Sequence, residues 1–173
     1  MLYGSALIAG ILNQARLRQA IKTTTFAGSN ATQSNVIFTL TGVVQILRLW
    51  GVVTTTIGPN HTAGFFQLND QTATPDITAS SGITLSGLAV GTLFFKEGLA
   101  ATALNLKSAA AGFLEEPAVV GDQSFQPFII GKKSGATTTL DYNYATTDTP
   151  TTGAARICAL WLPLSADGNL AAA

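Results

Sequence analysis

The chain has 173 residues with nine basic and nine acidic side chains, so its formal net charge is zero. Charged residues make up 10% of the chain, against about 25% in typical globular proteins. Such sparse charge excludes a strongly basic nucleic-acid binder and leaves no net repulsion to keep copies apart. It favours a subunit of an assembly over a freely diffusing enzyme, because Thr, Ser, Asn, Gln and Gly cover only part of the surface and copies or partners must bury the rest.

The N-terminal segment differs in pattern from everything after it. Its apolar residues recur at helical spacing: Ile8, Ile11, Leu12 and Ala15. Asn13–Ala20 are mostly good helix formers, and the polar segment Thr23–Asn35 follows as a predicted flexible connector. The predicted helix either folds on its own domain or forms an arm that packs on a neighbouring subunit. We therefore divide the chain into an N-terminal arm or helix with its connector, residues 1–34, and a β-domain, residues 35–173.

Charge is unevenly placed along the chain. Residues 1–69 contain four basic side chains and no acid: Arg16, Arg18, Lys22 and Arg48. Four charges are too dilute for nucleic acid, but they favour docking on an acidic neighbour. The apolar opening is shorter than the roughly 20 residues that span a bilayer, and it lacks the positively charged start of a secretion signal. We expect no membrane anchor and no export signal.

The longest run of β-favouring residues is Asn35–Gly58. Apolar side chains alternate along it with a period of two, which predicts a half-buried strand: Val36, Phe38, Leu40, Val44 and Ile46. The apolar face switches at Ile46 and Leu47. A bulge or a corner there would direct the strand from one sheet into another.

Later segments repeat the β pattern. Phe66 and Leu68 fall on one face of a predicted strand, and Leu140, Tyr142 and Tyr144 fall on one face of another. The turn-like TPTTG and the apolar AARICALWLPLS follow, so these last two strands are predicted to form a β-hairpin with a five-residue loop. Short strands separated by turns at intervals of about ten residues predict an all-β fold, a sandwich or a jelly-roll-like domain.

No catalytic or metal-binding pattern emerges. His61 is the single histidine and is predicted to be a chemically silent loop residue, because no His or Cys near it completes a metal site and no G-x-S-x-G element supports a triad. Cys158 is the single cysteine and is predicted to be a small buried hydrophobe. The acids are scattered, and the phosphate-binding glycine loop is absent. We expect a protein that is not an enzyme and takes no cofactor, metal or small-molecule substrate.

The aromatic residues allow two interpretations. Four of them, Trp50, Trp161, Tyr142 and Tyr144, are candidates for a flat platform that stacks on sugars. Aromatic residues that alternate along strands more commonly form a core or a subunit interface. The first interpretation gives a carbohydrate-binding sandwich or adhesin, and the second gives a structural protein.

Three segments together resemble a known group of proteins. These are IFTLTGVVQILRLWGVVTTTIG (37–58), DITASSGITLSGLAVGTLF (76–94) and GATTTLDYNYATTDTPTTGAARICALWLPLSADGNLAA (135–172). Their pattern is similar to that of the small β-rich virion proteins of tailed bacteriophages, with a Thr-Gly strand before G-V-V-T-T and a Y-x-Y strand near the end.

The resemblance implies a bacteriophage virion protein without enzymatic activity, a homotrimeric decoration (cement) protein located on the outer capsid surface. Its partners would be its own copies and the major capsid protein. A tail or head-fibre subunit is the alternative within the same group. Composition and pattern then give a set of candidate interface residues: Ile8, Ile11, Leu12, Arg16, Arg18, Lys22, Trp50, Tyr142 and Tyr144.

Overall fold

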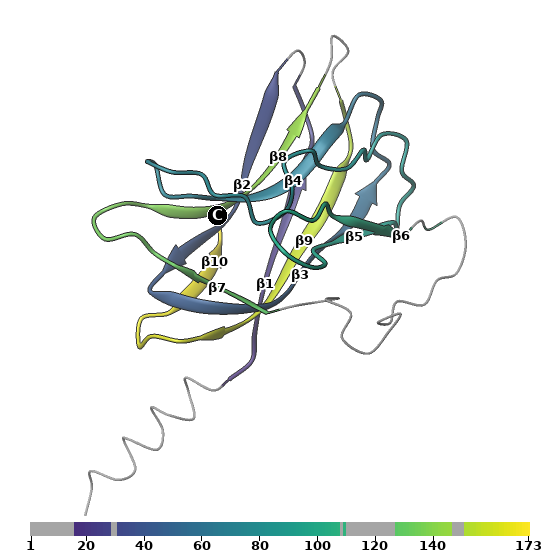
Figure 1. The fold of residues 1–173 in the computed structure, drawn as a ribbon. Helices are drawn as coiled ribbons and strands as arrows, with labels where there is room; N and C mark the ends of the chain where they lie inside the picture. Colours follow the sequence, from purple (N-terminus) through teal and green to yellow (C-terminus); the bar gives the residue numbers. More distant parts are fainter. Residues whose placement is uncertain (1–15, 29–30, 108, 110–126, 147–150) are drawn as a thin grey trace, which may run out of the picture.

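The computed structural model describes residues 16–28, 31–107, 109, 127–146 and 151–173 (Figure 1). Within them the chain is all-β, which confirms the predicted class, and its strands form two antiparallel sheets packed face to face. The strands are β1 (Arg18–Thr25), β2 (Thr32–Thr41), β3 (Val43–Thr55), β4 (Thr62–Asn69), β5 (Leu93–Phe95), β6 (Asn105–Lys107), β7 (Phe128–Gly131), β8 (Thr138–Ala145), β9 (Ala154–Pro163) and β10 (Asn169–Ala172).

Strands that are neighbours in a sheet are mostly not consecutive in the sequence. One sheet, here sheet A, has the order β1-β9-β3-β5-β6, with β7 also paired to β3. The other, sheet B, has the order β10-β2-β8-β4. The core between them contains apolar side chains from both, including Phe38, Phe66, Phe94, Tyr142 and Trp161. The prediction that Phe66 and Leu68 share one face of a strand is confirmed, and that face is the core side of β4, since Phe66 is fully buried and Leu68 packs against the core.

The prediction for the N-terminal segment is wrong where the structure describes it. Arg18–Ala20, predicted to be helical, begin β1, and the predicted connector Thr23–Asn35 overlaps the end of β1 and the start of β2. β1 pairs with β9 along its whole length, from Arg18 opposite Trp161 to Thr25 opposite Ala154. Eight residues of antiparallel pairing outweigh a modest helix propensity. The boundary predicted after residue 34 therefore lies inside β2, and the helical pattern at Ile8–Ala15 lies outside the described residues.

The central stretch is two strands, one in each sheet. β2 and β3 meet at Gly42, whose φ of 57° suits glycine, and a Cβ there would lie 2.3 Å from Ser165 Oγ. The corner between the sheets is therefore at Gly42 and not at Ile46. The bulge predicted at Ile46–Leu47 is confirmed by a shift in the β3–β9 register between Ile46 and Arg48.

A second bulge explains why Val36 does not point inward as predicted. The β2–β8 register shifts between Val36 and Phe38, so Ile37 and Phe38 are both fully buried while Val36 is 44% exposed. A bulge inserts one residue into the strand and moves those before it to the opposite face.

The predicted C-terminal hairpin is also wrong, although both of its strands exist. β8 belongs to sheet B, between β2 and β4, whereas β9 belongs to sheet A, between β1 and β3. The connection between them crosses from one sheet to the other. Leu140, Tyr142 and Tyr144 of β8 and Trp161 of β9 thus face the same core from opposite sides.

Candidate functional site

The outer face of sheet A carries a row of apolar side chains. Ile21 lies opposite Cys158 across β1–β9, Cys158 opposite Trp50 across β9–β3, and Trp50 opposite Phe95 across β3–β5. Paired residues of antiparallel strands point to the same face. Their chain neighbours, such as Ala20 and Ala159, belong to the core between the sheets, so this row points outward.

The row is widened by apolar residues at adjacent positions. Leu160, Leu162, Val52 and Leu93 occupy the same face and are each half-buried. Ile21, at the β1 edge, is 46% exposed. We call this set, with Ile21, Cys158, Trp50 and Phe95, the sheet A outer face. It extends across β1, β9, β3 and β5; Phe95 and Cys158 are buried within it, at 0% and 3% exposure, and the other members are partly exposed.

The charge of sheet A has one sign. Its six strands contain no Asp or Glu, and they hold five cations: Arg18, Lys22, Arg48, Lys107 and Arg156. Because the whole chain has nine cations and nine acids, the remainder holds four cations and all nine acids. Such a face is electrostatically complementary to an apolar surface with acidic residues around it.

Two of the predicted interface cations close the edge of the sandwich. The Arg18 guanidinium lies 5.3 Å from the centre of the Trp161 ring, and Lys22 Nζ donates to the backbone oxygen of Ala173, the residue after β10. Both side chains cover the core with their aliphatic stems. Arg16, just before β1, is exposed. Ile8, Ile11 and Leu12 lie outside the described residues.

Of the predicted interface aromatics, only Trp50 lies on an outer face. Tyr142 and Tyr144 are 0% and 1% exposed inside the subunit, and the Tyr144 hydroxyl donates to the carbonyl oxygen of Ala27 at 2.8 Å. Neither ring can contact a second subunit or a sugar without unfolding, so their assignment as interface residues is corrected to the core. The aromatic platform for sugars is lost for the same reason.

His61 lies in the loop before β4, as predicted, and it is fully buried, which the sequence did not predict. Its ring stacks on Tyr144 with centroids 4.5 Å apart and an angle of 8°, and Phe26 meets it edge-on at 4.7 Å. Neither Nδ1 nor Nε2 has a hydrogen-bond partner among the described residues. Burial lowers the pKa of His61 to about 4, so the ring is neutral at pH 7. The partners that orient a catalytic histidine are missing from the described part of the chain.

Cys158 lies within the sheet A outer face and is buried between its neighbours, as predicted for a small hydrophobe. Burial raises the pKa of its thiol, although Arg156 opposes that effect. The protonated thiol is a poor nucleophile. Cys158 therefore contributes packing to the face rather than reactivity.

Sheet B presents a different outer surface, made of polar side chains bonded to one another. Asp141 Oδ2 accepts from Asn69 Nδ2 at 3.1 Å and from Ser34 Oγ at 3.4 Å, and Asn143 Nδ2 donates to Gln67 Oε1 at 2.9 Å. Asp141 Oδ2, Asn143 and Gln67 thus have partners within the subunit, whereas Asp141 Oδ1 has none among the described residues. Alternation along β8 puts Asp141 and Asn143 on the face opposite Tyr142. Their hydrogen-bond partners come from other strands, and no local sequence pattern predicts which residues these are.

Other kinds of site find no support in the residues that the structure describes. Within those residues no three His, Cys, Asp or Glu side chains gather where one metal ion could bind them. No helix in the same part of the chain has the length and apolar character needed to cross a membrane. Comparison of the sequence with protein-family models and with characterised proteins, and of the fold with solved structures, finds no match.

Proposed function

We propose that this chain is a non-enzymatic structural protein of a tailed-phage virion, a homotrimeric decoration protein that binds the major capsid protein on the outer surface of the shell. The observation that carries the proposal is the sheet A outer face, a row of apolar side chains across β1, β9, β3 and β5, in a sheet whose six strands contain no acid. The 10% charge content and the resemblance of three segments to virion proteins support it.

Physically, the subunits bury the sheet A outer face against their siblings in this proposal. Removing apolar surface from water contributes about 25 cal/mol per Å², and a stable interface buries more than about 1,000 Å² in total. The apolar N-terminal segment before β1 would reach a neighbouring capsid subunit and tie adjacent units together. Such a protein needs complementary surfaces and no reactive group.

Two matched substitutions test the role of the sheet A outer face in trimer formation. Ile21→Asn places a polar side chain in that face, and Val36→Asn makes a similar change on the outer face of sheet B, at nearly equal exposure of 46% and 44%. An unsatisfied buried amide costs about 1–3 kcal/mol, so we expect Ile21→Asn to weaken trimers about tenfold or more at each interface. Val36→Asn should leave them intact. Light scattering over a micromolar concentration series measures both.

A monomeric parent chain would contradict the homotrimer. Equal weakening by Ile21→Asn and Val36→Asn would move the interface away from sheet A. Circular dichroism of each variant separates loss of association from loss of folding.

A truncation tests the proposed arm. Because β1 begins at Arg18, the deletion must stop at residue 15 to spare the sheet. We expect the shortened chain to fold and to form trimers, but to lose co-sedimentation with empty capsids, since the arm supplies that contact. Full capsid binding by the truncated chain would remove the arm from the proposal. A trimer that binds no shell at all, even at full length, would instead favour a tail or head-fibre subunit.

A further inference from the structure

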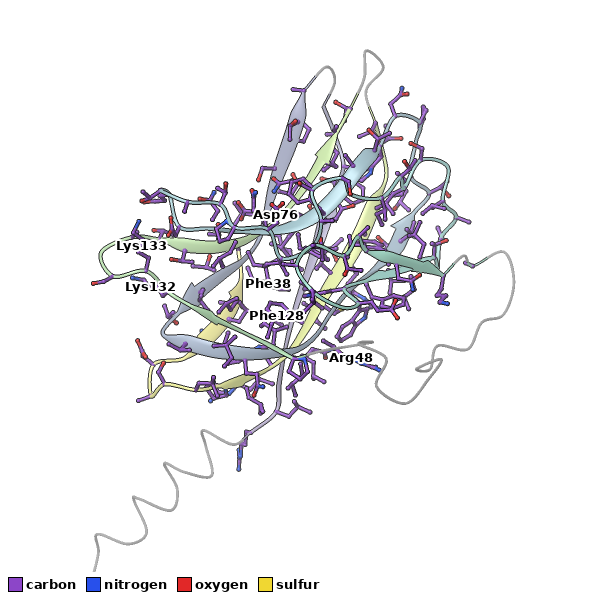
Figure 2. All side chains as sticks on the ribbon, in the orientation of Figure 1. Phe38, Arg48, Asp76, Phe128, Lys132 and Lys133 are labelled. Atoms are coloured by element: carbon purple, nitrogen blue, oxygen red, sulfur yellow. The ribbon has the colours of Figure 1, made fainter. Side chains whose placement is uncertain are left out.

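A cavity of about 310 Å³ lies on the side of the molecule where sheet B meets β7. Two loops, the end of β4 and most of β7 form it, and Figure 2 labels Asp76 and Phe128 from its wall. The lining is mainly apolar: Leu68, Pro75, Ile77, Leu99, Ala100, Pro127, Phe128, Ile129 and Ile130. Its size is at the small end of the range for sites that bind small molecules.

The mouth of this cavity is apolar as well. Ile129 and Leu99 are 63% and 60% exposed, the highest values among the exposed large apolar side chains of the described residues, and both line the cavity. Apolar residues that are exposed around a concave apolar site are typical of ligand entrances. They would be covered by an apolar ligand that fills the cavity.

Lys96 gives the cavity a charged group. It lines the wall, yet its side chain is only 8% exposed. Nζ donates to the carbonyl oxygen of Gly98 and lies 5.3 Å from the centre of the Phe128 ring. An ammonium has three N–H donors, and in the described part of the chain no carboxylate lies within ion-pair distance of this one. A buried cation without a counter-ion is costly, and its burial lowers the pKa of Lys96.

We propose that the cavity binds a small apolar monocarboxylate, with the apolar body of the ligand against Leu68, Ile77 and Phe128 and its carboxylate on Lys96. The carboxylate would supply the missing counter-ion and accept the remaining donors of the ammonium. Asp76 is the other charged wall residue, and its Oδ1 already accepts from Gln67 Nε2 at 3.1 Å. Its negative charge disfavours ligands with a second acid group. This inference is independent of the proposed virion role.

The test is isothermal titration calorimetry of the full chain with octanoate as the probe. Octylamine and octanol, which have the same number of carbon atoms but no carboxylate, are the comparison ligands. We expect saturable binding of one octanoate per subunit, at least tenfold tighter than binding of octanol or octylamine, because the charge-assisted bond to Lys96 is lost with either. No saturable octanoate binding, equal binding of octanol, or tighter binding of octylamine would each overturn the proposal.

Variants locate the binding. Lys96→Met keeps the aliphatic stem but removes the charge, and should weaken octanoate binding about tenfold or more. Lys132→Met is the matched control, because Lys132 is exposed and does not line the cavity, and it should not weaken binding. If Lys96→Met unfolds, Leu99→Ser serves in its place, with the comparably exposed Leu164→Ser as control. Weaker binding in Leu99→Ser alone supports the cavity, and equal binding in both variants overturns it.

Discussion

Lowering the pH from 7 to 4 should destabilise the folded chain by about 3 kcal/mol through His61 alone. The ring is buried against Phe26, Tyr142 and Tyr144, and neither of its nitrogens has a hydrogen-bond partner among the described residues. A proton added there creates a charge with no compensating partner in that part of the structure, which is why burial lowers the pKa of His61 to about 4.

The direction of the change in stability with pH depends on whether the folded or the unfolded state binds more protons. Unfolded His61 has its ordinary pKa of 6.5, so between pH 6.5 and 4 the unfolded chain is protonated there and the folded chain is not. Unfolding is then favoured as the pH falls, and stability is complete only above 6.5. The interval of about 2.5 pH units, at about 1.4 kcal/mol per unit, gives about 3 kcal/mol. Urea unfolding at half-unit steps of pH measures the slope.

His61→Phe is the matched control for this effect. It keeps an aromatic ring for the stack with Tyr144 and removes the titrating group, so its stability should be nearly constant between pH 5 and 7. That window also avoids Asp70, whose pKa is lowered by hydrogen bonds from the backbone of Ala73 and Thr72, so that its contribution is lost only at more acidic pH. An unchanged slope in His61→Phe would assign the acid sensitivity to other groups.

Trp161→Ala should cost about 3–5 kcal/mol of stability, the range measured when large aromatic side chains are removed from cores. Trp161 is 2% exposed and comes first among the largest fully buried side chains of the described residues. It lies opposite Ile46 on β3 and Arg18 on β1, so its loss leaves a cavity where three strands of sheet A meet the core. Chemical denaturation gives the change in the free energy of unfolding.

Trp161→Phe should cost much less, for a specific reason. The indole Nε1 has no hydrogen-bond partner among the described residues, so replacement by a phenyl ring removes a buried polar group as well as some packing. The two effects oppose each other. If Trp161→Phe lowered the free energy of unfolding as much as Trp161→Ala, the prediction would be contradicted. The indole N–H would then contribute a stabilising hydrogen bond that is not seen among the described residues.

Local pattern in the sequence was enough for the class of fold and for several details. Alternation with a period of two identified β4 and β8 and grouped Leu140, Tyr142 and Tyr144 on one face, but it did not show that this face is the core. The change of apolar face at Ile46 located a real bulge. These features are local, because the pleat sets side-chain direction residue by residue and burial of one face leaves a direct trace in the sequence.

Which strands pair was decided by the tertiary structure alone. Residues 18–25 have helix-forming and polar character, yet they form β1 because β9 offers a full row of backbone partners. β8 and β9 look like a hairpin, but a period of two is the same whether a strand pairs with its chain neighbour or with a distant one.

The candidate sites depend on the same long-range pairing. The sheet A outer face brings Ile21, Trp50 and Cys158 side by side from three distant segments, and the cavity at Lys96 needs β7 beside two loops. His61 is equally dependent, since it is buried by Phe26, which follows β1, and by Tyr144 of β8, and not by its own polar turn. The sequence shows whether each side chain favours a buried or a solvent-exposed position. Which neighbours bury that side chain is decided only when the two sheets pack together.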